Sequence, residues 1–335
     1  MSVSTKPALH SVAANDGESG ALLAFCKASA DPLRLNILRV LSKDSYGVLE
    51  LCQILDCKQS GMSHHLKILA KAGLVTTRRE GNSIYYRRSL QSCSDSLTAL
   101  QDRLFHSVDQ LTLNENIEQH IKTVQGEREE RSKEFFAENA DKFQQQQEQV
   151  ADYSLYGSHA LELLTRTIEA GKSTVLEVGP GEGAFLTELS SRFKQVYALD
   201  NSEVMLAKAK EKVSAHKLDN IVFIHGDTKS PALQKNQFDS IAVNMVLHHI
   251  PSPADIFYDL ANALKPDGQL QITDLCHHDQ NWAREACGDL WLGFEPEDIE
   301  QWATDAGLTE KQSMYLAQRN GFRVQIRQFE KFHDR

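Results

Sequence analysis

The feature that most constrains this 335-residue chain is a glycine-rich turn between a predicted buried strand and a predicted helix. Residues 174–178 (Thr-Val-Leu-Glu-Val) form a short β-prone run, and residues 179–183 read Gly-Pro-Gly-Glu-Gly. Helical spacing then begins at Ala184. Glycines here let the strand turn sharply and let a ligand approach the backbone at a helix N-terminus. The segment therefore predicts a ligand-binding strand–helix unit.

Four more predicted strands follow, with helical segments among them, at residues 195–199, 221–225, 238–244 and 269–274. Such alternation predicts an α/β fold with a doubly wound parallel sheet, which binds ligands at the carboxyl ends of its strands. The second strand leads directly to Asp200, 23 residues beyond Glu177. A carboxylate at that position is placed to bind both hydroxyls of a ribose.

Together, Glu177, the glycine loop and the acids at the strand ends resemble class I S-adenosylmethionine-dependent methyltransferases over about residues 150–335. A dinucleotide is the competing ligand, but its pyrophosphate disfavours these acids, whereas a cationic sulfonium and ammonium favour them. The resemblance implies S-adenosylmethionine or S-adenosylhomocysteine, with Asp200 on the ribose, Asp227-Thr228 at the adenine and Asn244 near the sulfonium. The expected cofactor contacts are Tyr153, Glu177, Gly179, Gly181, Gly183, Asp200, Asn201, Asp227, Thr228 and Asn244.

The first ninety residues predict a winged helix-turn-helix. Asp31-Pro32 is a helix start, because Asp can cap free N–H groups and Pro at the first position loses no hydrogen bond. Two short amphipathic helices follow, the second over about 59–71 with Gly73 as its stop. Two β-prone runs at 74–79 and 84–88, joined by a Gly-Asn turn, predict the hairpin called the wing.

Charge separates this part from the rest of the chain. Residues 1–90 hold 12 Lys/Arg and 7 Asp/Glu, for +5, which leaves 36 − 12 = 24 basic and 46 − 7 = 39 acidic residues, for −15. DNA is therefore expected to bind residues 1–90 rather than the acidic remainder of the chain. A winged helix can instead bind protein, but small polar residues on the second helix favour a major groove. The expected DNA contacts are Gln59, Ser60, Ser63, His64, His65, Lys67, Arg78, Arg79 and Asn82.

The run from Gln59 to Leu69, with Ala72-Gly73-Leu74-Val75, resembles the ArsR-type family of dimeric bacterial repressors. The resemblance implies DNA contacts from Ser63, His64 and their neighbours. Metalloid-sensing members carry a Cys-x-Cys pair where this chain has Gly47 and Leu49, and Cys52 lies nearby alone. Because soft-metal sites need two to four converging ligands, no metal site is expected.

The expected organisation is a multidomain chain: a disordered tail at 1–18, a winged-helix and dimerisation domain at 19–112, a helical linker at 113–150, and a methyltransferase-like domain at 151–335. A flexible charged linker is the alternative for the third part. Leucines at helical spacing over 91–111 favour a homodimer. No apolar run approaches the ~20 residues that span a bilayer, and the first 20 residues lack the apolar stretch of a secretory signal, so a cytoplasmic protein without membrane association is expected.

Proton acceptors for methyl transfer are sought at the strand ends, where His248, His249 and His277 are the candidates; each could equally cap a loop. Residues 289–294 resemble the substrate-binding region of quinone-biosynthesis methyltransferases. The whole architecture resembles regulators that fuse an ArsR-like DNA-binding domain to a methyltransferase-like domain. One hypothesis is a regulator of methionine or methyl-cycle genes that responds to the bound ligand. The alternatives are an active methyltransferase on a quinone-like molecule, or on an arsenical held by Cys276 and Cys287.

Overall fold

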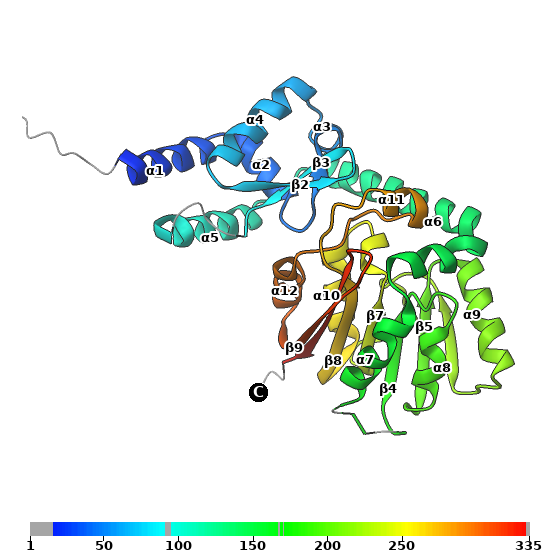
Figure 1. Cartoon of the computed structure of the whole chain (residues 1–335). Coiled ribbons are helices and arrows are strands. Elements are labelled where there is room, and N and C mark those ends of the chain that lie inside the picture. The colour runs from blue at the N-terminus through cyan, green and yellow to red at the C-terminus, as the bar shows by residue number, and fades with distance from the viewer. Residues whose placement is uncertain (1–15, 91–94, 167, 170, 333–335) are drawn as a thin grey trace, which may run out of the picture. The chain divides into compact units, whose positions relative to one another are not determined.

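The structure, a computed structural model, describes residues 16–90, 95–166, 168–169 and 171–332. The chain divides into two compact units (Figure 1): Met1–Arg78 with Tyr85–His120, and Arg79–Ile84 with Ile121–Arg335. Helix α1 (Asp16–Ser29) begins inside the expected disordered tail, and the rest of that tail lies outside the described residues. Within the described ranges, no helix combines the length and the apolar character needed to cross a membrane.

The helical part of the first unit follows the predicted helix-turn-helix. Asp31 caps α2 (Pro32–Val40) by accepting a 3.0 Å hydrogen bond from the backbone N–H of Arg34. Helices α3 (Val48–Ile54) and α4 (Gln59–Lys71) then form the unit's characteristic pair. Helix α4 buries the predicted apolar side chains of Met62, Leu66 and Leu69. The winged helix-turn-helix prediction is confirmed.

The wing is the hairpin of β2 (Val75–Glu80) and β3 (Ser83–Arg88), to which the structure adds a third strand, β1 (Tyr46–Gly47), that the sequence did not predict. The sheet order is β1-β3-β2, with Tyr46 opposite Tyr86. At the base of β3, Arg88 donates two hydrogen bonds of 2.9 and 2.7 Å to Asp109, the last residue of α5 (Asp95–Asp109). This bidentate pair joins the wing to α5.

A single 36-residue helix, α6 (Glu115–Val150), occupies the place of the expected linker. The boundary between the two units falls within it, between His120 and Ile121. His120 lies on its first-unit part, 3.1 Å from the carbonyl oxygen of Ile54 at the end of α3. Residues 115–150 therefore form a helix rather than a flexible linker.

The second unit contains a seven-stranded sheet of order β6-β5-β4-β7-β8-β10-β9. The first five of these strands run parallel, as predicted, and β10 pairs antiparallel with both β8 and β9. The Rossmann-like fold class is confirmed, although the sheet is mixed rather than wholly parallel. Its strands are β4 (Thr174–Val178), β5 (Gln195–Asp200), β6 (Ile221–His225), β7 (Phe238–Asn244), β8 (Leu264–Leu275), β9 (Leu308–Ala317) and β10 (Arg323–Lys331).

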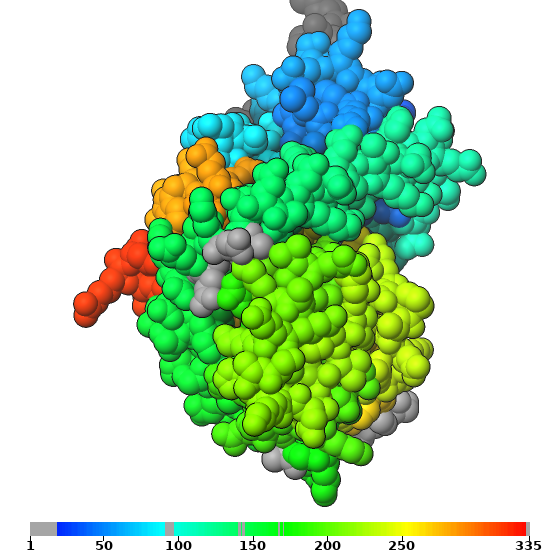
Figure 2. Space-filling model, turned by 90° about the vertical axis from the view of Figure 1, so that its right-hand side faces the viewer, coloured from blue at the N-terminus to red at the C-terminus, as the bar shows by residue number. Residues whose placement is uncertain are grey.

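Helices pack on both faces of this sheet (Figure 1). On one side α7 (Tyr153–Thr165) contacts α8 (Ala184–Ser190), which contacts α9 (Glu203–Ala215); Figure 2 views the unit from the α9 side, where side chains form a continuous surface. On the other side α10 (Pro253–Ala263) contacts α12 (Pro296–Asp305). Strand order reverses between β4 and β7, and ligands of such folds bind at the carboxyl ends of the strands beside this reversal.

Candidate ligand-binding site

A cavity of about 330 Å³ opens at the carboxyl ends of β4, β5 and β7. Its size falls in the ~300–1,000 Å³ range of small-molecule sites. Nine of the ten expected cofactor contacts line it: Tyr153, Glu177, Gly179, Gly181, Asp200, Asn201, Asp227, Thr228 and Asn244. We call it the ligand cavity.

The glycine loop forms one wall of the ligand cavity. Its three glycines differ in what surrounds them. All have positive φ, which side chains disfavour. A Cβ on Gly179 would stand 2.3 Å from Val246 Cγ2, whereas a Cβ on Gly181 would meet nothing within 4 Å. Gly183 is the expected contact that does not line the cavity; it caps α8 and faces Ala209. Only Gly179 and Gly181 therefore shape the cavity wall directly.

Glu177 supplies a buried acid at the end of β4. Burial raises the pKa of its carboxyl to about 8, against a smaller opposing effect of the neighbouring Asn244 amide. Among the described residues, Glu177 Oε2 and both polar side-chain atoms of Asn244 have no hydrogen-bond partner. Buried polar atoms are normally paired, so these three indicate a polar or cationic ligand.

Acidic side chains continue around the rim at the ends of the next two strands. Burial raises the pKa of Asp200 to about 6, although its Oδ1 accepts a 2.8 Å hydrogen bond from the N–H of Ser202. After β6, Asp227 Oδ1 accepts from the N–H of Lys229 at 2.9 Å. Thr228 Oγ1 donates to Asp259 Oδ2 at 2.6 Å, which brings an unpredicted acid from α10 into the cavity wall.

Aromatic side chains close another part of the cavity. The hydroxyl of Tyr153 donates a 2.5 Å hydrogen bond to Glu188, and burial together with this carboxylate raises the pKa of Tyr153 far above its usual value. Tyr153 is therefore a neutral wall residue. Phe136, from α6, also lines the cavity. This role could not be predicted from the sequence, because the segment that forms α6 has a polar, glutamine-rich pattern.

The three candidate histidines separate in the structure. His249, on the short helix η1 (Leu247–His249), lines the cavity, whereas His248 is buried behind it and His277 is not among the lining residues. His277 instead lies with Nδ1 3.2 Å from the Leu292 carbonyl oxygen, because the chain turns away after β8.

The Cys276 and Cys287 thiols are buried, and burial raises both pKa values, that of Cys287 to about 12. Protonated thiols are poor ligands for arsenic, which weakens the arsenical hypothesis.

Burial lowers the pKa of His248, but the carboxylates of Asp274 and Asp289 outweigh it and raise the value to about 9. The pKa of His249 is held well below its usual value by burial and by His248. His248 Nδ1 lies 2.8 Å from Asp274 Oδ1. Of the pair, His249 is the neutral imidazole at the cavity wall.

The expected DNA contacts on α4 form its exposed side. Gln59, Ser60, Ser63, His64 and Lys67 are all exposed. His65 instead faces inward, with Nδ1 3.7 Å from Asp31 and 3.4 Å from Arg34 Nη1, because it lies on the inner side of the helix.

On the wing, Arg79 and Asn82 are exposed but Arg78 is buried. Side chains alternate across a strand, which separates Arg78 from Thr77 and Arg79. His65 and Arg78 are therefore the least exposed of the expected DNA contacts.

Comparison with known proteins finds one family match in each of the two units. Residues 31–77 match the model of the family described as bacterial regulatory protein, arsR family, and residues 176–272 match that of the methyltransferase domain. The chain joins an ArsR-family helix-turn-helix domain to a class I S-adenosylmethionine methyltransferase domain.

The methyltransferase domain is similar to demethylmenaquinone methyltransferases of Shouchella clausii (32% identity over 106 residues; 31% of this chain, 45% of the relative) and Bacillus mycoides (33% over 76 residues; 23% and 32%). This chain thus spans less than half the length of these relatives. A putative methyltransferase solved in complex with the Haloferax volcanii Trm112 activator covers 61% of this chain and 99% of its own, at 16% identity and a TM-score of 0.50. That likeness supports the fold alone.

The pKa of Glu177 predicts a pH dependence of ligand binding to the methyltransferase domain. Since this carboxyl is largely protonated at neutral pH without ligand, binding of an ammonium group should release a proton. Affinity for S-adenosylhomocysteine should therefore rise several-fold from pH 6 to 7.5. Calorimetry in buffers of different ionisation enthalpy measures the release, and Glu177→Gln should abolish it. Proton uptake on binding would contradict the assignment.

The exposed side chains of α4 lead to a prediction about the affinity and specificity of DNA binding by the ArsR domain. Lys67→Ala should weaken binding to all sequences and reduce the slope of log K against log salt by about 0.9, the effect of one lost phosphate contact. Ser63→Ala should instead reduce discrimination between operator and unrelated DNA, by about 0.5–1.5 kcal/mol, the contribution of one neutral hydrogen bond. Fluorescence anisotropy at several salt concentrations separates the two effects. Lys172→Ala, an exposed lysine of the other unit paired with Glu169, is the matched control and should change neither.

Proposed function

We propose that this chain is a cytoplasmic, homodimeric transcriptional regulator that binds double-stranded operator DNA through its ArsR domain and binds S-adenosylmethionine or S-adenosylhomocysteine in its methyltransferase domain. The observation that carries the proposal is the ligand cavity with its unpaired Glu177 and Asn244 atoms, on the same chain as a DNA-reading helix. Genes of methionine and methyl-group metabolism are the expected targets, because their products set the concentrations of these ligands.

Helix α6 supports a coupling between ligand and DNA. Its first residues belong to the first unit, where His120 contacts the end of α3. Its later residues, including Ser132 and Phe136, line the ligand cavity. A continuous helix transmits a displacement along its length better than a flexible linker. Coupling of about 1–3 kcal/mol is the usual range for such systems and corresponds to a 5–150-fold change in affinity.

The test is the affinity of the full chain for its own promoter DNA, measured by fluorescence anisotropy with and without saturating S-adenosylhomocysteine or S-adenosylmethionine. We expect at least one ligand to change the affinity by fivefold or more. At ligand concentrations that saturate the natural chain only, the Asp200→Ala variant, which should bind ligand at least a hundredfold more weakly, should bind DNA with an affinity that neither ligand changes. DNA affinity that is the same with both ligands and without them, although both bind, would contradict the regulatory proposal.

The second candidate function is methyl transfer to a small hydroxylated molecule. Two observations favour it: His249 is a neutral imidazole at the cavity wall, and the relatives include demethylmenaquinone methyltransferases. A neutral imidazole beside the methyl donor can remove the acceptor's proton as the methyl group transfers. The test is conversion of S-adenosylmethionine to S-adenosylhomocysteine with a panel of quinols and phenols. Absence of turnover above the rate of His249→Ala across the panel would count against an enzyme.

A further inference from the structure

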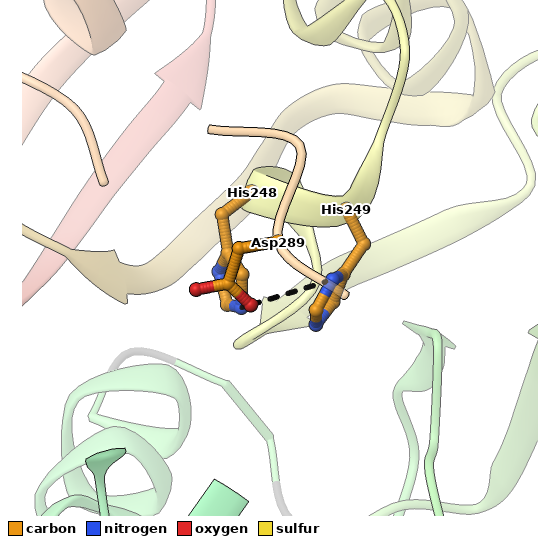
Figure 3. Close-up of side chains that lie close together, drawn as sticks. All are labelled: His248, His249 and Asp289. Carbon is orange, nitrogen blue, oxygen red and sulfur yellow. Dashed lines mark ion pairs between the residues drawn. The ribbon is translucent and has the colours of Figure 1, made fainter. Parts of the chain in front are cut away.

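Behind the ligand cavity, two histidines and one aspartate meet in a buried cluster (Figure 3). His248 and His249 come from η1, and Asp289 comes from the loop after α11 (Trp282–Cys287). Asp289 Oδ1 lies 3.8 Å from His248 Nε2 and 3.8 Å from His249 Nδ1. The three side chains are 3, 7 and 1% exposed. One donor atom from each residue can be chosen so that all lie within 4.8 Å of one another.

Asp289 has two ion-pair contacts at 3.8 Å but no hydrogen bond to its carboxylate from the described part of the chain. Neither of its oxygens has a hydrogen-bond donor among the described residues. The two imidazoles at 3.8 Å lie beyond hydrogen-bonding distance. Buried carboxylates are normally paired, hydrogen-bonded or bound to a metal, because an isolated one is costly. The spacing between Asp289 and the two rings leaves room for a bridging cation.

Asp274, at the end of β8, orients the first histidine. One of its oxygens lies 2.8 Å from His248 Nδ1, and the other accepts a 2.9 Å hydrogen bond from the N–H of Leu247. Because Nδ1 faces Asp274, Nε2 is the ring atom that faces Asp289, and it would bind a metal ion once His248 gives up its second proton. Histidines that bind metals are typically held in this way by a second carboxylate.

We propose that His248, His249 and Asp289 bind a first-row divalent transition-metal ion, with Asp274 supporting His248. Metal–nitrogen and metal–oxygen bonds are ~2.1 Å, so each ring nitrogen, 3.8 Å from Asp289 Oδ1, could share one ion with that oxygen at an angle of roughly 130°, with His249 Nδ1 turning from the Gly288 carbonyl oxygen 3.4 Å away. Two imidazoles and one carboxylate favour zinc, iron or manganese over magnesium or calcium. No metal site was expected here because Asp289 lies 40 residues after His249, and no sequence motif joins them.

The ion would lie where it could take part in methyl transfer, the second candidate function. Only this role of the ion rests on that proposed function. His249 lines the ligand cavity, so the ion lies beside the space for a methyl acceptor. With His249 bound to the ion and so no longer a free base, an acceptor hydroxyl that completed the ion's coordination would become more acidic and hence a better nucleophile at neutral pH. Metal binding itself does not depend on whether the chain is an enzyme, and its test reads binding alone.

The test uses the full chain, freed of metal by chelator and then titrated with Zn²⁺ by calorimetry and with Co²⁺ by visible absorption. We expect one strong site that gives ligand-field bands without a sulfur-to-cobalt charge-transfer band, which separates it from binding by cysteine thiolates. Mg²⁺ should not compete. Asp289→Asn should weaken Zn²⁺ binding by at least a hundredfold and Asp274→Asn by about 10–100-fold.

His216→Gln is the matched control, because His216 is exposed and lies on its own helix end 2.8 Å from the Lys212 carbonyl oxygen. It should bind Zn²⁺ like the natural chain. Circular dichroism and binding of S-adenosylhomocysteine establish that each variant is folded, and Asp274→Asn provides the comparison if Asp289→Asn does not fold. The proposal is overturned if the natural chain has no such site, or if folded Asp289→Asn or Asp274→Asn variants retain the natural affinity.

Discussion

Replacing Asp200 by alanine is expected to weaken the binding of S-adenosylhomocysteine by a hundredfold or more. We expect this carboxylate, which lies at the end of β5, to bind both ribose hydroxyls of the ligand. Hydrogen bonds to a charged group contribute about 1.5–3 kcal/mol each. The loss of two therefore costs about 3–6 kcal/mol, and each 1.4 kcal/mol is a factor of ten in affinity.

Isothermal titration calorimetry of the full chain measures this loss. Glu203→Ala is the matched control, because Glu203 is an exposed carboxylate three residues further along the same loop and helix start. It should leave the affinity within about twofold of the natural value, since exposed ion pairs contribute little. Natural affinity in a folded Asp200→Ala variant would contradict the assignment of the ribose site.

Alanine at Gly179 is expected to destabilise the methyltransferase domain by about 2–5 kcal/mol. Part of this cost, ~1–2 kcal/mol, is the left-handed backbone conformation at φ 65°. The remainder, ~1–3 kcal/mol, comes from the overlap of the new Cβ with Val246, only 2.3 Å away. Denaturant unfolding of the full chain, followed in the transition of this domain, measures the change.

Gly181→Ala is the matched comparison in the same loop. It carries the same backbone penalty at φ 55°, but its Cβ meets nothing within 4 Å, so the loss of stability should stay near 1–2 kcal/mol. Because Gly181 lines the cavity, this variant should weaken ligand binding more than its small loss of stability would indicate. Equal destabilisation by the two substitutions would show that contact with Val246 does not constrain the loop.

Local signals in the sequence predicted the elements that depend on local interactions. Helix α4 begins and ends at the predicted residues, because its apolar spacing and Gly73 fix both. The strand ends that carry Glu177 and Asp200 were also predicted, since short apolar runs before glycine or acid mark the buried strands of such sheets.

The elements that were missed depend on partners far away in the chain. Strand β1 has only two residues and exists because β3 pairs with it. Strands β9 and β10 form a hairpin at the sheet edge, and their pairing with β8 could not be inferred from an alternating pattern alone. Phe136 reaches the cavity only because α6 continues into the second unit.

The histidines also show which features local sequence predicts and which depend on contacts between residues far apart in the chain. Their place after the fourth strand was evident, and the structure adds what separates them: His249 faces the cavity, His248 faces Asp274, and His277 lies elsewhere. Only the fold brings Asp289 to the first two. A sequence therefore identifies candidate chemistry, and the tertiary contacts decide which candidates can act together.

The central claim is that ligand in the methyltransferase domain and DNA on the ArsR domain change each other's affinity. The most direct measurement is a calorimetric titration of the full chain with S-adenosylhomocysteine and with S-adenosylmethionine, each free of DNA and saturated with promoter DNA. The account predicts that DNA shifts the affinity for at least one ligand by about 5–150-fold, and by the same factor as that ligand shifts DNA affinity. Tight binding of both ligands with affinities that DNA leaves unchanged would contradict it.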